Sequence, residues 1–407
     1  MKQTEIGLIP DDWEVKEIKD FADVTTGDKN TQDAEENGKY PFYVRSPIVE
    51  RINKFSYDTE GVITAGDGVG TGKVFHYAKG KFGLHQRAYL IYNFKNTDPK
   101  YFYYNFSKNF YERVHSMTAK SSVDSVRREM ITKMQIPIPP TLAEQQRIAK
   151  ALSDVDALIS TTEKLIQKKK NIKQGAMQNL LTGKKRLPGF AKSTTYKQTE
   201  LGLIPEDWEV KTLGELGSFK NGISKPSEDF GFGSPFVNLM DIFGITKISE
   251  TNHLGLINSN IIEQNTYSLK EGDVLFVRSS VKPEGVGLTT VIKKDLDKTV
   301  YSGFILRFRE IGNELTTDFK EYVFYNKGFR DSLISSSTVS ANTNINQPAL
   351  KNLIIVYPSS KEEQTALATV LSSMDKEIET LNTKLEKYRN LKTAMMQQLL
   401  TGKIRLV

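Results

Sequence analysis

One glycine-rich run in the sequence has the residue types of a phosphate-binding loop. Residues 66–73 read GDGVGTGK, and backbone N–H groups in such a loop could hold phosphate oxygens. The spacing does not fit a Walker A motif, because Asp67 stands where its first glycine should be and Val74 follows the lysine in place of Ser or Thr. A tight β-turn is therefore the favoured interpretation.

Residues of other catalytic classes are scarce or scattered. The sequence has no cysteine, which excludes disulfides and thiolate metal sites, and its four histidines form no HExxH or other close ligand pair. Asp11, Glu14 and Lys16 resemble the acidic set of metal-dependent nucleases, but the spacing is too short to place both carboxylates on one metal. We therefore predict no catalytic residue, no metal site and no bound cofactor.

Polar side chains that can read nucleic acid are frequent in two segments rich in predicted β-turns. Arg and Lys can bond guanine or hold phosphate, and Asn can pair with an adenine edge. The candidate DNA-binding residues of the first segment are Arg45, Lys73, Lys81, His85, Arg87, Lys120 and Arg127. Those of the second segment are Lys225, Arg278, Ser279, Ser280, Lys282, Tyr301, Asn342 and Asn344. The alternative for each of them is an ordinary solvated surface side chain.

Composition and charge are compatible with a nucleic-acid partner. The net charge is +7, and a surplus of Lys and Arg favours polyanions, although this signal is weak by itself. No apolar run approaches the roughly 18 residues of a membrane span, and the N-terminus lacks the apolar core of a signal peptide. We expect a cytoplasmic protein.

The elements that would position these residues occur twice. Residues 2–16 and 197–211 are identical at thirteen of fifteen positions, and the block 142–187 returns as 361–406 at a constant offset of 219. The segments between these blocks, roughly 20–140 and 215–358, do not match each other. The pattern indicates one framework that carries two different heads.

The repeated block that closes each half predicts a long helix. Each helix has a capping-box start, in which Thr141 or Ser360 bonds forward and Glu144 or Glu363 reaches back. Each ends at Leu-Leu-Thr-Gly, whose glycine, at 183 or 402, suits the left-handed position after the last turn. About 40 residues correspond to about 60 Å of helix.

Apolar residues at heptad spacing predict that these helices pack on each other. In the second helix the seam is Leu367, Leu371, Met374, Ile378, Leu381, Leu385, Tyr388, Met395 and Leu399. In the first it is Ile148, Leu152, Val155, Ile159, Thr162, Ile166, Lys169, Ile172, Ala176 and Leu180, weakened by Thr162 and Lys169. We favour an antiparallel coiled coil of the two helices; the alternative is a helical hairpin buried within each half.

The predicted fold class is α+β, with two β-rich mixed α/β heads joined by the paired helices as a pseudo-twofold internal repeat. Strands are expected at 61–66, 73–77, 88–92, 273–277 and 303–308, and aromatic-rich helices at 98–110 and 318–329. The expected domains are 1–140, 141–196 (helix and linker), 197–359 and 360–407 (helix). Trp13 and Trp208, the only tryptophans, are expected to pack at the base of each head.

The order and doubling of these motifs resemble the specificity (S) subunit of type I restriction–modification enzymes over essentially the whole chain. The resemblance rests on the GLIPDDWEVK and GLIPEDWEVK openings, the IPIPPTLAEQQRIA segment and the LLTGKKRL and LLTGKIRL helix ends. Residues 271–280 and 300–304 also look like the family's second-head pattern. One difference between the copies is Thr365-Ala366, where the first repeat has Gln146-Arg147.

The resemblance implies that 1–140 and 197–359 are target recognition domains that read the two halves of an asymmetric, bipartite double-stranded DNA site. It implies a coiled-coil spacer and two methyltransferase (M) subunits, which bring S-adenosylmethionine and the catalysis. Restriction (R) subunits would join that complex. Two other interpretations remain open: a stand-alone DNA methyltransferase or nuclease, and a coiled-coil scaffold that binds no DNA.

Overall fold

The computed structural model of the protein describes residues 1–117, 125–191 and 195–406. The chain forms two compact units, and each contains part of both long helices. Unit 1 consists of Met1–Lys164 and Asn382–Val407, and unit 2 of Leu165–Leu381. Unit 1 is therefore assembled from the beginning and the end of the sequence, whereas unit 2 is one continuous segment.

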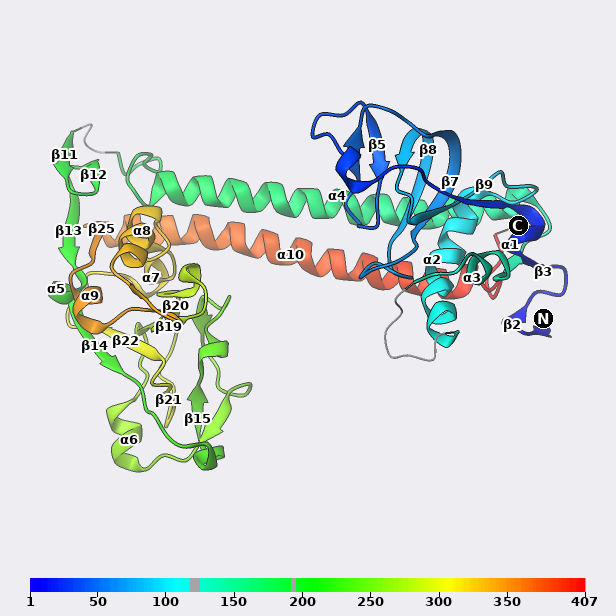
Figure 1. Cartoon of the computed structure of the whole chain (residues 1–407). Coiled ribbons are helices and arrows are strands. Elements are labelled where there is room, and N and C mark those ends of the chain that lie inside the picture. Colours follow the sequence, from blue (N-terminus) through cyan, green and yellow to red (C-terminus); the bar gives the residue numbers. More distant parts are fainter. Residues whose placement is uncertain (118–124, 192–194, 407) are drawn as a thin grey trace. The chain divides into compact units, whose positions relative to one another are not determined.

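The two long helices are α4 (Leu142–Leu180) and α10 (Lys361–Leu399), each of 39 residues (Figure 1). Both are unbroken, so neither half of the chain forms a helical hairpin of its own. Gly183 and Gly402 follow them with φ angles of 68° and 67°. This is the left-handed region, in which glycine avoids the Cβ clash of other residues. The predicted helix ends are confirmed.

The predicted capping boxes are only half correct. The N–H of Glu144 bonds the Thr141 hydroxyl at 3.2 Å, and that of Glu363 bonds the Ser360 hydroxyl at 3.3 Å, as a capping box requires. The glutamate carboxylates do not reach back to the cap. Each carboxylate instead binds an arginine that follows the C-terminal end of the other long helix. A charged partner offers the carboxylate two strong bonds, whereas the backbone offers one.

The helices are antiparallel wherever they pair within a unit. Along α4 the partners on α10 run backwards in sequence: Asp156–Lys392 and Glu163–Arg389 in unit 1, and Lys169–Glu377 and Lys173–Asp375 in unit 2. The predicted antiparallel pairing of the two helices is confirmed.

Most of the predicted seam lies in the helix interface. Thr162 is buried and satisfies its hydroxyl on the Leu158 carbonyl at 2.7 Å, and Lys169 is half-buried against Glu377. Ile172 is wrong, because it is 46% exposed. The neighbouring Lys173 is turned to the interface instead, where it pairs with Asp375.

The first head is built on one six-stranded sheet of order β4-β9-β7-β8-β5-β6. Its strands are antiparallel except for the β5–β8 pair, which is parallel. The strands are β4 (Asp23–Thr26), β5 (Tyr40–Tyr43), β6 (Glu50–Ile52), β7 (Tyr57–Ala65), β8 (Phe75–Leu84) and β9 (Ala88–Tyr92). The three strands expected in this head are confirmed.

The second head carries three smaller sheets, of orders β14-β22-β18-β20-β16, β17-β15-β21 and β19-β24-β23. The first contains β14 (Gly217–Asn221), β16 (Lys247–Ile248), β18 (Val274–Val277), β20 (Thr289–Ile292) and β22 (Ile305–Glu310). The second contains β15 (Phe230–Val237), β17 (Gly255–Ile257) and β21 (Val300–Tyr301). The third contains β19 (Ser279–Ser280), β23 (Thr338–Val339) and β24 (Thr343–Asn344).

The two heads nevertheless share a framework, as expected. β4, β9 and β7 are neighbours in the first head, and β14, β22 and β18 are neighbours in the same order in the second. The long β8 corresponds to β20 and β21 together. β21 runs parallel to β15, which pairs antiparallel with β17, just as β8 runs parallel to β5, which pairs with β6. The second head is thus an expanded version of the first.

Each unit contains the same short strand pairs at equivalent positions. Unit 1 has the hairpin β1 (Lys2–Thr4)–β2 (Gly7–Ile9) and the pair β3 (Glu14–Glu17)–β10 (Gln135–Ile138). Unit 2 repeats them as β11 (Tyr196–Thr199)–β12 (Gly202–Pro205) and β13 (Trp208–Thr212)–β25 (Ile354–Pro358). The remaining α-helices are α1 (Ile18–Phe21), α2 (Pro99–Ser116), α3 (Arg128–Thr132), α5 (Leu213–Leu216), α6 (Ile261–Thr266), α7 (Thr317–Val323), α8 (Lys327–Ser335) and α9 (Gln347–Lys351).

One expected helix is divided in two. Residues 318–329 span nearly all of α7, a turn and the start of α8. Asn326 causes the break, because its side chain accepts a hydrogen bond from Gly328 N–H at 2.8 Å and so caps a new helix.

The predicted packing of Trp13 and Trp208 is confirmed, since both are fully buried in the core of their unit.

Candidate functional site

An arginine clamp closes the base of each unit. In unit 2, Arg186 donates to both carboxylate oxygens of Glu363 at 2.5 and 2.6 Å and to those of Asp207 at 2.9 and 3.0 Å. Its guanidinium carbon also lies 5.7 Å from the centre of a Trp208 ring. The clamp joins the segment that follows α4, the turn between β12 and β13 and the first turn of α10.

Unit 1 contains the same clamp with the roles of the helices exchanged. Arg405, which follows α10, donates to Glu144 in the first turn of α4 and to Asp12 at 2.9 and 3.1 Å. It also lies 5.7 Å from the centre of a Trp13 ring. The arginines hold the pKa of Asp12 and the pKa of Asp207 below the usual aspartate value, chiefly through these side-chain hydrogen bonds.

A second duplicated contact joins each head to both long helices. In unit 1 the Tyr104 hydroxyl of α2 donates to Asp156 of α4 at 2.7 Å, and Lys392 of α10 pairs with the same carboxylate at 2.7 Å. In unit 2 the Tyr322 hydroxyl of α7 donates to Asp375 at 3.1 Å, and Lys173 pairs with that carboxylate. The framework is therefore repeated down to individual side chains.

The β1–β2 and β11–β12 hairpins, which open the two repeats, expose apolar residues at equivalent positions. Ile6 and Leu8 of the β1–β2 hairpin are 40% and 51% exposed, and Leu201 and Leu203 of the β11–β12 hairpin are 39% and 60% exposed. Each pair lines a groove of its unit, of about 390 Å³ in unit 1 and about 720 Å³ in unit 2. Exposed apolar residues around a groove are typical of a protein-docking surface.

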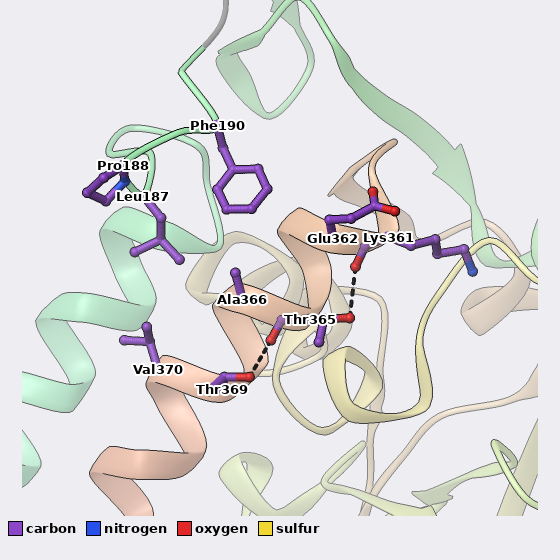
Figure 2. A pocket seen from close by; sticks show the side chains of 9 residues that line it. All are labelled: Leu187, Pro188, Phe190, Lys361, Glu362, Thr365, Ala366, Thr369 and Val370. Atoms are coloured by element: carbon purple, nitrogen blue, oxygen red, sulfur yellow. Dashed lines mark hydrogen bonds between the residues drawn. The ribbon is translucent and has the colours of Figure 1, made fainter.

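A third groove occurs in unit 2 and lacks an equivalent lining in unit 1. Leu187 and Phe190, after α4, face Ala366 and Val370 of α10 across it (Figure 2). In unit 1 the residue equivalent to Ala366 is Arg147, whose guanidinium donates to the Leu406 carbonyl at 2.9 Å. The sequence difference between positions 147 and 366 therefore makes this surface of unit 2 different from the equivalent surface of unit 1.

In the first head, three of the predicted DNA-binding residues gather around Asp67 in the glycine-rich loop. Arg45 and Arg87 each place a guanidinium nitrogen on one oxygen of the Asp67 carboxylate, at 2.5 and 3.0 Å. These two cations contribute to lowering the pKa of Asp67, against the opposing effect of partial burial. The loop itself is a series of turns closed by bonds such as Thr71 N–H to the Gly68 carbonyl, as expected.

His85 supports this cluster from below and is not a surface reader. It is only 4% exposed, and its Nδ1 accepts the Arg87 N–H at 3.0 Å. Burial, with Arg45 and Arg87 nearby, lowers the pKa of His85. His85, which was predicted to bind DNA, is instead buried and supports the Arg87 backbone.

The other candidates of the first head are dispersed. Lys73 lies over the Tyr111 ring and Lys81 over the Phe55 ring, at 5.1 and 4.8 Å from the ring centres. Arg127 is exposed and precedes α3. Lys120 lies outside the residues that the structure describes.

In the second head, most candidates lie on the β19-β24-β23 ribbon or next to it. Ser279 pairs with Asn344 and Ser280 with Thr343 across the ribbon, and Asn342 lies in the turn before β24. Exposed Arg278 joins the ribbon to β18, and exposed Lys282 follows it. The structure thus brings together six of the predicted polar readers, Lys282 among them.

Two candidates of the second head are placed differently. Tyr301, which was predicted to bind DNA, is instead fully buried, and its hydroxyl donates to the Lys220 carbonyl at 3.1 Å. Lys225 has only 16% of its side chain exposed, and its ammonium pairs with Glu263 at 2.9 Å.

One exposed aromatic residue beside the ribbon, Phe304, is not among the residues predicted to bind DNA. Phe304 is 61% exposed, and its carbonyl accepts the Arg278 N–H at 2.9 Å. Phe304 is two residues before Leu306 and four before Phe308, so the alternation of a strand would place it on their face, and both of them are fully buried. The alternation therefore predicted a core residue, and nothing in the local sequence marked Phe304 as exposed.

Within the ranges 1–117, 125–191 and 195–406, no three His, Asp or Glu side chains are grouped so that they could hold a metal ion. None of the helices in the same ranges has the length and apolar character needed to cross a membrane.

Comparison with known proteins agrees with the architecture. A family model described as type I restriction modification DNA specificity domain matches residues 10–174 and 205–387. The MjaVIII type I restriction enzyme specificity subunit of Methanocaldococcus jannaschii is 29% identical over 414 residues, 98% of this chain and 94% of its own length. The putative MjaX specificity subunit of the same organism is 29% identical over 435 residues, 99% of this chain and 96% of its own.

A solved structure shares the fold. The S subunit of a type I restriction–modification system from M. genitalium has a TM-score of 0.61 at 15% identity, over 98% of both chains. Because the family model covers most of the sequence in two matched segments, the chain belongs to the type I restriction–modification DNA specificity family.

Proposed function

We propose that this chain is the DNA sequence-specificity subunit of a type I restriction–modification complex. The observation that carries the proposal is a framework repeated to the level of single contacts, which presents two heads with different exposed side chains. Each head would read one half of a bipartite, asymmetric site. The long helices would hold the heads at a set separation, near one helical turn of DNA (about 34 Å) or a multiple of it.

The readers proposed for the first head are Arg45, Arg87 and Arg127, with Lys73 and Lys81 as phosphate contacts. Those of the second head are Arg278, Ser279, Ser280, Lys282, Asn342 and Asn344; Lys225, which pairs with Glu263, is a further phosphate contact in the proposal. Basic side chains supply sequence-independent affinity, and the amide and guanidinium groups supply base discrimination. The domain division 1–140, 141–196, 197–359 and 360–407 follows from this division of labour.

We further propose that the chain is not catalytic and works in the cytoplasm. Catalysis would come from two methyltransferase subunits that use S-adenosylmethionine, and restriction subunits would join the assembled complex. A purified chain should transfer no labelled methyl group to DNA alone, and should support transfer once methyltransferase subunits are added. Mapping methylated adenines genome-wide should reveal two unlike half-sites with a fixed spacer. Methyl transfer by the chain alone, or a contiguous palindromic motif, would contradict the proposal.

The two hairpins are the surfaces that best fit two copies of one partner. Leu8 and Leu203 lie at equivalent positions and line equivalent grooves, so a partner that docks on one unit can dock on the other. The groove around Ala366 cannot serve in this way, because Arg147 changes its equivalent. We assign the hairpins to the methyltransferase subunits.

We expect Leu8→Lys and Leu203→Lys each to yield a complex with one methyltransferase subunit in place of two. The double variant should bind neither. Loss of one buried leucine contact is worth about 1.5–3 kcal/mol, and hence at least about a tenfold weaker site. Light scattering on the purified complexes measures the stoichiometry.

Ile48→Lys and Ile311→Lys are the controls, because these residues are 67% and 78% exposed in their heads and lie outside both hairpins. They should leave the two-to-one stoichiometry unchanged. A full complex with the double hairpin variant would sink the assignment while leaving DNA recognition untouched.

A further inference from the structure

Arg87 and Phe304 occupy the same place in the frameworks of the two heads. Arg87 directly precedes β9 and Phe304 directly precedes β22, which are equivalent strands. The Arg87 carbonyl accepts the Gly66 N–H at 2.8 Å, and the Phe304 carbonyl accepts the Arg278 N–H at 2.9 Å. Gly66 and Arg278 are therefore equivalent positions as well.

The next hydrogen bonds extend the correspondence. The Gly66 carbonyl accepts the Val126 N–H at 2.7 Å, and the Arg278 carbonyl accepts the Ile345 N–H at 2.9 Å. A bridge between Asp67 and Ser125 matches the pairing of Ser279 with Asn344. The equivalence thus rests on backbone contacts and needs no sequence alignment of the heads.

The turn before each residue is also the same. The Ala88 N–H bonds the His85 carbonyl, and the Ile305 N–H bonds the Ser302 carbonyl, both at 2.9 Å. His85 N–H in turn bonds the Tyr43 carbonyl, as Ser302 N–H bonds the Val237 carbonyl, both at 3.0 Å. Position 87 of the first head is therefore position 304 of the second.

The side chains at this shared position differ in chemistry and agree in exposure. The Arg87 side chain and Phe304 are each 61% exposed. Arg87 is oriented by the Asp67 carboxylate at 3.0 Å, and Phe304 stands opposite the exposed Arg278 at the end of the β18–β22 ladder. Phe304 precedes the strand and is exposed, whereas Ile305 and Leu306, which begin β22, are both fully buried.

An exposed phenylalanine next to an exposed arginine fits the edge of a base pair. In the major groove, a phenylalanine can contact the C5-methyl group of thymine, and an arginine can bond O6 and N7 of guanine. We propose that positions 87 and 304 are one base-reading position used twice, with Arg87 selecting guanine and Phe304 selecting thymine. This inference rests on the proposed function and adds the residue and the base.

The first test compares base preferences in the assembled complex of the full-length chain. Wild type, Phe304→Ala and Phe304→Arg are selected against DNA libraries in which each half-site is randomised. We expect Phe304→Ala to lose a thymine preference at one position of one half-site. Phe304→Arg should prefer guanine there. The other half-site should be unchanged in both.

The second test removes only the methyl group. Replacing that thymine with uracil should weaken wild-type binding about fourfold, the amount expected for one buried methyl. The same replacement should not affect Phe304→Ala. Ile311→Ala is the control, because Ile311 is exposed just beyond the other end of β22 and lies away from Arg278.

The outcomes separate this inference from the proposed function. If the wild-type complex selects a bipartite site while Phe304→Ala keeps every base preference, only the role of position 304 is wrong. The same holds if both half-sites relax equally, or if uracil is bound as well as thymine at every position. If the wild-type complex selects no sequence, the proposed function fails. Phe304→Leu, which keeps an apolar contact, should retain the thymine preference.

Discussion

Arg186→Ala is expected to lower the free energy of unfolding of unit 2 by about 3–5 kcal/mol. The reason is that Glu363 would keep a buried charge without a partner, and removing one member of a buried ion pair costs about that much. Both side chains are nearly inaccessible, at 6% and 2% exposure. Urea unfolding followed by tryptophan fluorescence suits the measurement, because Trp208 lies beside the clamp.

Two variants serve as matched controls. Arg405→Ala removes the equivalent clamp of unit 1, and we expect a smaller loss because Arg405 is 27% exposed. Arg389→Ala breaks an exposed pair with Glu163 and should change the stability little. Equal small losses from all three variants would show that the clamps are surface pairs of no particular importance.

The clamp also makes a prediction about pH. Because Arg186 lowers the pKa of Asp207 in the folded state, this contact stabilises the fold fully above the ordinary aspartate pKa of about 4. The stabilisation is lost as the pH falls through the lowered pKa. The difference in stability between wild type and Arg186→Ala should therefore be constant near neutral pH and shrink in acid.

Deleting one heptad from each long helix is expected to change the spacer and leave both half-site sequences intact. Residues 162–168 of α4 and 380–386 of α10 are suitable, because each is one heptad and their removal keeps the ion pairs Asp156–Lys392 of unit 1 and Lys169–Glu377 of unit 2. The deletion shortens each helix by about 10 Å and keeps the heptad seam in phase. The original site should be bound at least about tenfold more weakly, and a different spacer should become the best.

Libraries that hold both half-sites and vary the spacer measure this effect. A variant of full length, in which only exposed residues of the same two segments are replaced by Gln, should keep the original spacer. Unchanged spacing with altered half-site recognition would show that the helices do not set the distance. Both results can be obtained with the complex that is used for the stoichiometry experiment.

The sequence predicted the framework well, because its signals are local and doubled. Helix lengths followed from heptad spacing, and the ends followed from Gly183 and Gly402, whose positive φ angles few other residues tolerate. The predicted seam was wrong at Ile172, because Lys173 takes the place in the helix interface and pairs with Asp375. An ion pair between distant residues leaves no trace in the local pattern.

The candidate site was predicted less well, because exposure depends on long-range packing. Tyr301 and His85 looked like surface readers, yet both are buried and bonded to the backbone. Phe304 looked like a core residue and is exposed. The clamps were not predicted either. Glu144 had been interpreted as part of a helix cap, and its partner Arg405 is 261 positions away in the sequence.

The interleaved make-up of the two units has a consequence for the order of folding during synthesis. Unit 2 is one continuous segment, so it can close as soon as residue 381 has left the ribosome. Unit 1 starts first but must wait, because Leu399, Leu400 and Arg405 complete its core and its clamp. Until then its core around Trp13 stays open to chaperones and proteases, and a translational stop before codon 399 would leave the earlier-made head without these contacts.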